Sequence, residues 1–305
     1  MISDIKFSAG LDQSALAYAA KIPFFQQHSQ VQFKPGLNIL FGQNGCGKST
    51  LLRMIALILA AEQGGVSTIT QSWFRTVAKG FSGIEMAHDG QPILFGNPRH
   101  TVGLIGGGFD DDFMEMGLRN TVSKASTGQT TLGRLGQMLA VLLGKGEFPK
   151  RIEDRVGNVN DYWRKQYDAA KAAMAASIPK GQQTLVFDEP ESGLALHVQR
   201  NIFQMFLKAH REGKYQVIAA SHSPFALGLP GVNYIEMSDG YLALAEEAVR
   251  KLSLQFEVQQ VLAEFEQKKS AKAPAAVPPT ASPDEPAPAA APAKKRAPRK
   301  TPKSA

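Results

Sequence analysis

The sequence predicts an α/β fold in which helices flank a largely parallel core sheet. Two observations support this prediction. Short apolar runs over residues 37–41, 184–187 and 216–220 do not alternate apolar with polar residues, which is typical of strands buried on both faces. Longer stretches of helical character separate these runs, and an alternation of strands with helices favours parallel strands.

The first predicted strand, residues 37–41, leads into a glycine-rich loop and then into a helix over residues 51–61. The loop matches G-x-x-x-x-G-K-[ST] in full, between a strand and a helix as this motif requires. Its glycines let backbone N–H groups turn toward a phosphate, and the N-terminus of the following helix favours an anion. Lys48 is expected to reach the terminal phosphates, and Ser49 to offer a hydroxyl to Mg²⁺. The predicted nucleotide-binding residues are Gly42, Gln43, Asn44, Gly45, Cys46, Gly47, Lys48, Ser49 and Thr50.

The next helical stretch opens with Ala-Ser-Thr-Gly-Gln at residues 125–129. A serine at a helix start with a glycine nearby presents backbone donors to an anion. Two further helices are expected over residues 135–143 and 160–177, joined by a polar link. They form a helical insertion over about residues 134–179.

The second apolar run, residues 184–187, ends at two adjacent carboxylates, Asp188 and Glu189. Ligands of open α/β sheets bind at the carboxyl ends of the strands. Asp188 is therefore predicted to orient Mg²⁺ through a water, and Glu189 to polarise the water that attacks a γ-phosphate. The third run, residues 216–220, ends at Ser221 and His222.

Taken in chain order, these four segments resemble the ABC-type ATPase superfamily: Walker A, a variant of its signature sequence, Walker B with the following glutamate, and a switch histidine. The resemblance implies ATP and Mg²⁺ as cofactors and an ABC-ATPase head with a helical signature subdomain. It implies that Glu189 is the catalytic base and that His222 contacts the γ-phosphate. It also implies an ATP-dependent, head-to-tail homodimer in which Ser126, Gly128 and Gln129 of one subunit cover the ATP held by the other.

Within this superfamily the sequence of residues 188–194 and 221–224 looks most like that of one group of bacterial proteins. These are soluble predicted ATPases without coiled-coil arms, grouped near RecF and the overcoming-lysogenization-defect nucleases. The stretch between Lys48 and Ser126 is too short for the coiled-coil arms of SMC and related repair ATPases. The stretch between Gln129 and Asp188 is longer than in transporter ATPases. Ala195 stands where many relatives carry an aspartate, so that contact across the dimer is not expected here.

Two further parts of the family's site have more than one candidate. The polar side chain that senses Mg²⁺ after an antiparallel strand is Gln91 or Asn97, which flank the apolar run 93–95. The aromatic ring that stacks on adenine is one of three phenylalanines that also fit a hydrophobic core: Phe24, Phe25 and Phe33.

The C-terminal region divides near residue 268. Residues 241–269 contain no Gly or Pro, and Leu254, Val258, Val261 and Phe265 recur at helical spacing, which predicts an amphipathic helix docked on the body. Residues 268–305 are rich in Pro and Ala and contain no aromatic residue, which is typical of a disordered tail. The predicted domains are therefore an ATPase domain over residues 1–267 and a tail over residues 268–305.

Charge is concentrated in this tail. Residues 268–305 hold nine Lys and Arg and two acidic residues, so they account for the whole net charge of +7 and the body is neutral. The basic cluster over residues 294–300 would suit a nucleic acid, bound mainly through phosphates. The alternative is a solvated extension, because no aromatic side chain is interleaved for base stacking.

Cysteine content and hydropathy bear on location. The single cysteine, Cys46, cannot form an intrachain disulfide, which fits a reducing compartment. The longest apolar run, residues 51–61, is shorter than the roughly 20 residues that a membrane helix needs. The sequence therefore predicts a cytoplasmic protein without its own membrane segment.

The function expected from these features is ATP hydrolysis to ADP and phosphate that drives or gates a protein partner or a nucleic-acid process, with DNA repair or anti-phage defence as the family-level expectation. Two alternatives remain open. One is the ATP-binding subunit of an ABC transporter, which would need a membrane partner. The other is a nucleotide-gated DNA clamp in which turnover is incidental.

Overall fold

A computed structural model describes residues 1–14, 16–59, 61–63, 66–67, 80–97, 127–148, 161, 165 and 178–272. The chain divides into two compact units, Met1–Ser253 and Leu254–Ala305. The predicted helix 160–177, the serine at 126 and the residues after 272 lie outside the described ranges, apart from residues 161 and 165. The predicted domain boundary at residue 267 remains a prediction.

A seven-stranded sheet forms the centre of the first unit, in the order β10-β3-β9-β8-β7-β4-β5. The pairs among β10, β3, β9, β8, β7 and β4 are parallel, and only β5 runs antiparallel to its neighbour, β4. The predicted α/β fold with a largely parallel sheet is therefore confirmed. The strands are β3 (Leu37–Phe41), β4 (Glu62–Gln63), β5 (Val66–Ser67), β7 (Ile93–Gly96), β8 (Gln183–Asp188), β9 (Tyr215–Ala220) and β10 (Asn233–Glu236).

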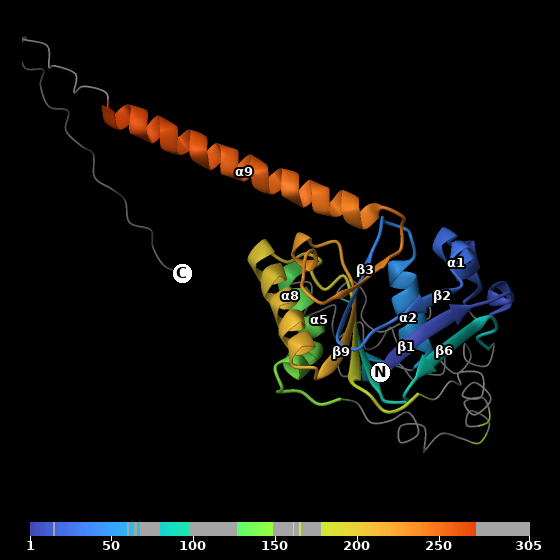
Figure 1. Cartoon of the computed structure of the whole chain (residues 1–305). Helices are drawn as coiled ribbons and strands as arrows, with labels where there is room; N and C mark the ends of the chain where they lie inside the picture. The colour runs from blue at the N-terminus through green and yellow to red at the C-terminus, as the bar shows by residue number, and fades with distance from the viewer. Residues whose placement is uncertain are drawn as a thin grey trace, which may run out of the picture. The chain divides into compact units, whose positions relative to one another are not determined.

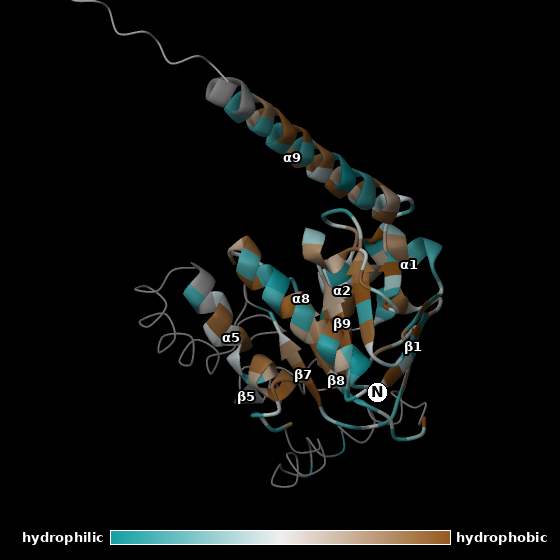
Figure 2. Cartoon of the chain, turned by 60° about the vertical axis from the view of Figure 1, so that its left-hand side comes forward, coloured by the Kyte–Doolittle hydropathy of each residue, from teal (hydrophilic) through white to brown (hydrophobic). Residues whose placement is uncertain are grey.

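Helices cover both faces of this sheet (Figure 1). On one face α2 (Lys48–Ile58) packs against alternate side chains such as Leu40, Val186 and Ile218. On the other face lie α5 (Thr127–Leu142) and α8 (Leu196–Arg211), packed against side chains such as Phe187 and Val217. Because both faces are covered, the inner strands β7, β8 and β9 are mainly apolar, and the polar residues of β8 and β9 lie near the strand ends. Figure 2 colours the strands by hydropathy.

A second, antiparallel sheet has the order β2-β1-β6 and was not predicted from the sequence. Its strands are β1 (Ile2–Phe7), β2 (Gln30–Gln32) and β6 (Ile84–His88). The chain between β1 and β2 forms two 3-10 helices, Leu11–Gln13 and Ala17–Lys21, and the short helix α1 (Pro23–Gln27). Buried side chains of this sheet and of α1 belong to the same hydrophobic cluster as α2, so the second sheet extends the core on that face.

The last helix, α9 (Tyr241–Lys272), confirms the predicted helix but corrects where it ends. It continues five residues into the segment predicted to be tail, since the first helix-breaking proline is Pro274. The prediction that it docks on the body stays a prediction, because the four spaced apolar residues belong to the second compact unit. Apolar spacing identifies an amphipathic face but does not specify what covers it.

Candidate functional site

The glycine-rich loop joins the end of β3 to the start of α2, as predicted. Gly45 and Gly47 have positive φ angles of 82° and 109°, a conformation that glycine adopts without strain. Gly47 also sits tightly against α1 and the residue before it, because a Cβ added there would lie 3.0 Å from Ile22 and 3.1 Å from Phe25. The turn and this close approach explain why glycine is needed at position 47.

Lys48 is the first residue of α2, and its side chain folds back over the loop. It is 4% exposed, and its ammonium group donates hydrogen bonds to the backbone carbonyls of Gly42 at 2.8 Å and Gln43 at 2.9 Å. Burial of an ammonium group is costly unless such partners are present. The loop thus holds a positive charge next to backbone N–H groups at a helix N-terminus, an arrangement suited to a polyphosphate.

Asp188 brings three elements together at the carboxyl edge of the sheet. Ser49 Oγ donates a hydrogen bond to Asp188 Oδ1 at 2.8 Å, and Asn97 Nδ2 donates one to Asp188 Oδ2 at 2.7 Å. Asp188 ends β8 and Asn97 follows β7, and these parallel neighbours are in register, with Gly96 opposite Phe187. Both Asp188 and Asn97 are buried. The hydroxyl of Ser49 and the carboxylate of Asp188 are oxygen donors of the kind that Mg²⁺ prefers.

Asn97 is therefore the candidate that the structure brings to Asp188, and Gln91 is not. The side-chain amide of Gln91 donates hydrogen bonds to Asp89 and to the carbonyl of Gly181, away from the loop. The expectation that an antiparallel strand precedes this residue is wrong, since β7 pairs in parallel with β8 and β4. Within the described ranges no group of three or more His, Cys, Asp or Glu side chains could hold a metal.

Glu189 occupies a strained position at the turn after β8. Its φ of +51° is the one positive value for a non-glycine residue in the described chain, and such strain is typical of functional positions. Its backbone N–H donates to the carbonyl of Ala220, which ties this turn to the end of β9. Ser192 Oγ donates to Glu189 Oε2 at 3.1 Å.

His222 follows β9, and its ring faces the same turn. Its Nε2 atom lies 3.9 Å from Glu189 Oε1. The parallel register that sets Asp188 opposite Ala220 explains this proximity, because the residues after two adjacent strand ends meet at the same edge. The structure thus brings together Glu189 and His222, which are 33 residues apart in the sequence.

A further carboxylate, Glu191, was missed by the sequence reasoning. It is 8% exposed, and burial raises the pKa of its carboxyl above the usual range. Hydrogen bonds from the His222 backbone and from Ser221 oppose this rise, while the nearby charge of Glu189 adds to it. The only sequence signal was a second acid two positions after Glu189.

Several of these groups line one cavity of about 760 Å³, within the usual size range of small-molecule sites, whereas Lys48, Asp188 and Asn97 are not among its lining residues. Tyr241, the first residue of α9, also lines it and was not predicted. The lining residues are Gln43, Asn44, Gly45, Ser49, Glu189, Glu191, Ser192, His222 and Tyr241.

Of the predicted signature residues, Gly128 and Gln129 lie in the first turn of α5, as expected for a segment that opens a helix. Gln129 is exposed and does not line the cavity of its own chain. Thr131 Oγ1, one turn along α5, donates a hydrogen bond to the carbonyl of Ser192 at 2.9 Å and joins this helix to the turn after β8.

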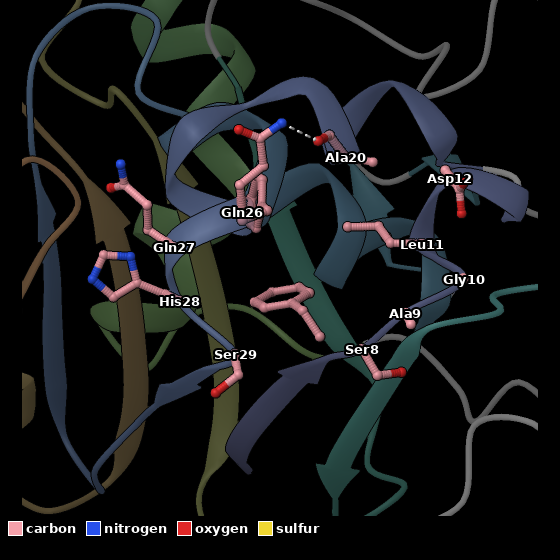
Figure 3. Close-up of a pocket in the computed structure, with 12 residues that line it drawn as sticks. Ser8, Ala9, Gly10, Leu11, Asp12, Ala20, Gln26, Gln27, His28 and Ser29 are labelled. Carbon is pink, nitrogen blue, oxygen red and sulfur yellow. Dashed lines mark hydrogen bonds between the residues drawn. The ribbon is translucent and has the colours of Figure 1, made fainter.

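The three phenylalanines considered for adenine stacking are all buried, at 4% to 6% exposure, and belong to the hydrophobic core. None of them lines the cavity of the loop. Phe25 also borders a second cavity of about 420 Å³, lined by residues such as Asp12, Gln27 and His28 (Figure 3).

Two protein families match parts of the chain. The family described as "AAA domain" matches residues 22–124, and the family described as "AAA domain, putative AbiEii toxin, Type IV TA system" matches residues 168–228. The first range contains the glycine-rich loop, and the second contains Asp188, Glu189 and His222.

Similar proteins are described as transporter ATP-binding proteins. The chain is 29% identical over 192 residues to the ABC transporter ATP-binding protein NatA of Bacillus subtilis, a match that covers 60% of this chain and 65% of NatA. It is 24% identical to the energy-coupling factor transporter ATP-binding protein EcfA2 of Spiroplasma kunkelii, covering 79% of this chain and 73% of that protein. The solved structure of cbiO1 from Clostridium perfringens, part of the ABC transporter complex cbiONQ, is 16% identical, with a TM-score of 0.32 and coverage of 77% and 90%.

The glycine-rich loop and the residues after β8 and β9 thus lie in segments that match AAA domain families, and the chain spans just under two thirds of the length of NatA. Among the described helices, none is both long and apolar enough to cross a membrane.

Proposed function

We propose that this chain binds ATP at the cavity beside the glycine-rich loop and hydrolyses it with Mg²⁺. The observation that carries the proposal is the hydrogen-bonded set of Ser49, Asp188 and Asn97 next to the facing pair of Glu189 and His222. Metal binding, water activation and phosphate contact are thereby assigned to neighbouring groups on one edge of the sheet.

In this proposal the loop amides and Lys48 bind the phosphates, and Ser49 and Asp188 hold Mg²⁺. When bound, Mg²⁺ would neutralise charge on the phosphate oxygens. Glu189 accepts a proton from the attacking water, and His222 contacts the γ-phosphate. In this proposal positioning and electrostatics supply the catalysis, with Glu189 as the proton acceptor and Lys48 as the positive charge beside the phosphates.

We further propose that the active form is a head-to-tail dimer. The exposure of Gln129 away from the cavity of its own chain supports this arrangement, since a signature residue that served its own ATP would have to line that cavity. In the dimer Ser126, Gly128 and Gln129 of one subunit would cover the ATP of the other.

For the partner, the named relatives favour an ABC transporter role over the nucleic-acid role that the sequence suggested. NatA and EcfA2 are both described as transporter ATP-binding proteins, and a chain of this kind would sit at the cytoplasmic face of a membrane partner. A place near RecF and the overcoming-lysogenization-defect nucleases finds no support among these relatives. A DNA-binding tail is likewise a weaker proposal.

The test is phosphate release from ATP by the purified chain, with Mg²⁺ and with excess chelator, compared with a His222→Ala variant. We expect Mg²⁺-dependent release that falls at least about tenfold in the variant, because one transition-state contact is lost. Equal release by both proteins would contradict the assignment of His222. Capture of a membrane protein in detergent extracts would favour the transporter role, and capture of nucleic acid alone would favour the other.

A further inference from the structure

The carboxylate of Glu191 joins the two turns that carry the proposed catalytic groups. Its Oε1 atom accepts three hydrogen bonds, from Ser221 Oγ at 2.8 Å, from the backbone N–H of His222 at 2.6 Å and from the backbone N–H of Ser223 at 3.1 Å. All three donors belong to the turn after β9. Glu191 itself belongs to the turn after β8, so one oxygen atom links the two turns.

The turn after β8 is held together by its own backbone. Ser192 N–H donates to the carbonyl of Glu189 at 3.1 Å, and Leu194 N–H donates to the carbonyl of Glu191 at 3.0 Å. Glu191 is therefore fixed relative to Glu189. The Glu191 side chain accepts a hydrogen bond from the backbone N–H of His222, so the position of His222 is also fixed relative to Glu189. His222 Nε2 lies 3.9 Å from Glu189 Oε1.

Burial makes this link costly to break. Glu191 is 8% exposed, and its second oxygen, Oε2, is screened from solvent and has no hydrogen-bond partner among the described residues. When a buried backbone N–H loses its acceptor, the folded state is destabilised by the full desolvation free energy of that donor. Removal of the carboxylate would leave the N–H group of His222 in that state, whereas Ser223 N–H would keep its contact with Ser221 Oγ at 2.9 Å. The turn after β9 would have to move to satisfy the N–H of His222.

We propose that Glu191 is a positioning residue for ATP hydrolysis: it holds the backbone of His222 so that the imidazole faces Glu189 and the cavity. This inference rests on the proposed function, and it assigns Glu191 no contact with the reacting atoms. It also explains why a carboxylate is tolerated in a buried place beside Glu189, since an acceptor of three hydrogen bonds is needed there.

The chemistry of the link defines the variants. The three bonds need a single acceptor oxygen at the position of Oε1, which the amide of Glu191→Gln also supplies. Glu191→Asp keeps the charge but is one methylene too short to reach the turn after β9. Glu191→Ala removes the acceptor. Glu212→Ala is the matched control, because the Glu212 side chain is 49% exposed and its partner Lys208 lies one helical turn away at the surface.

The first measurement is steady-state ATP hydrolysis. We expect Glu191→Ala and Glu191→Asp to lose about tenfold to a hundredfold in kcat with KM within about threefold, since misplacement affects the reacting geometry more than nucleotide binding. Glu191→Gln and Glu212→Ala should keep kcat within about threefold of the unmodified chain. A Glu191→Gln variant as slow as Glu191→Asp, with an intact fold, would overturn the proposal. If Glu191→Ala does not fold, Glu191→Asp carries the same comparison.

A double-mutant cycle tests whether Glu191 acts through His222. The combined Glu191→Asp and His222→Ala variant should hydrolyse ATP as slowly as His222→Ala alone, because the group that Glu191 positions is absent. Multiplied losses would show that Glu191 acts independently of His222 and would overturn the proposal.

Amide hydrogen exchange without nucleotide separates this inference from the proposed function. Peptides that span residues 221–223 should exchange faster in Glu191→Asp than in the unmodified chain, and no faster in Glu191→Gln or Glu212→Ala. Unchanged exchange in Glu191→Asp would overturn the positioning role whatever the ATPase activity. If exchange is faster in Glu191→Asp but the unmodified chain does not hydrolyse ATP, the positioning role is supported and the proposed function is refuted.

Discussion

Replacement of Asp188 by Asn tests the centre of the site through both stability and activity. The amide has nearly the same shape but one acceptor oxygen and one donor NH₂ in place of two acceptor oxygens. Asn97 Nδ2 can only donate, so the amide oxygen must face Asn97 at the 2.7 Å contact. The new NH₂ then faces Ser49, whose hydroxyl can rotate to accept a hydrogen bond in place of donating one across 2.8 Å.

The expected loss of stability follows from this exchange. Hydrogen bonds to charged groups contribute about 1.5–3 kcal/mol and neutral ones about 0.5–1.5 kcal/mol, so two bonds that lose their charge cost about 2 kcal/mol together. Removal of a buried charge offsets part of this cost. For a domain of this size the melting temperature should fall by at most about 8 °C. Asp188→Ala should fall further, because it also leaves buried Asn97 Nδ2 without its acceptor.

Activity should change far more than stability. Loss of a metal ligand removes several kcal/mol of transition-state stabilisation, so phosphate release should fall at least about a hundredfold and need more Mg²⁺ for half-maximal rate. The assays are thermal unfolding and a Mg²⁺ titration of phosphate release, with exposed Asp12→Asn as the control. Asp188→Asn with wild-type turnover and Mg²⁺ dependence would refute the reasoning. So would an Asp188→Ala variant as stable as Asp188→Asn.

Three further outcomes are expected. Glu189→Gln should bind ATP but hydrolyse it at least about a hundredfold more slowly, because the amide cannot accept a proton. This variant should run as an ATP-dependent dimer in gel filtration, and a monomer with bound ATP would contradict the proposed dimer. Deletion of residues 273–305 should leave ATPase activity within about twofold, and if the full chain binds duplex DNA with a log–log salt slope of roughly −0.9 per neutralised phosphate, the deletion should abolish that binding. Burial raises the pKa of the Glu191 carboxyl, so the folded chain holds the carboxyl proton more tightly than the unfolded chain does. The stability that this proton contributes is present below the pKa of the unfolded state and is lost as the pH rises through the raised pKa of the folded state. Glu191→Gln, which does not titrate, should therefore gain melting temperature relative to the unmodified chain as pH rises from about 4 to about 8, and a constant difference would contradict the direction of the pKa shift.

The main parts of the site could be predicted because they depend on local sequence and on one topological rule. Each apolar run of the sheet ends in its polar residues, and parallel strands bring those ends to the same edge. Ser49 and Asp188 could therefore be predicted from the residues themselves, whereas the role of His222 was implied by the resemblance to ABC-type ATPases. The register between β8 and β9 then places Glu189 and His222 together.

Other parts depend on information that one sequence does not carry. A choice between Gln91 and Asn97 depends on which residue follows the carboxyl end of β7, and the apolar run 93–95 looks the same from either side. The sequence does not distinguish a buried glutamate such as Glu191 from a solvated one. The hydrogen-bond partners of Glu191 lie 30 to 32 positions away on another turn. The strands β1, β2 and β6 are short, so the alternation of buried and exposed residues extends over too few positions to identify them from the sequence. Helix α9 could be predicted from its apolar spacing and its lack of Gly and Pro, but this spacing does not identify what its apolar face contacts.

The central claim is that this chain hydrolyses ATP at the glycine-rich loop, and replacement of Lys48 by Ala tests it most directly. Lys48 is held by carbonyls of the loop itself and contributes its charge to bound phosphates, so the variant should remain folded. Lys34→Ala, an exposed lysine before β3, is the control. We predict that phosphate release falls at least about tenfold in Lys48→Ala, since a lost charge contact costs more than about 1.4 kcal/mol, and stays unchanged in Lys34→Ala. Release by a folded Lys48→Ala within about twofold of the unmodified chain would contradict the claim.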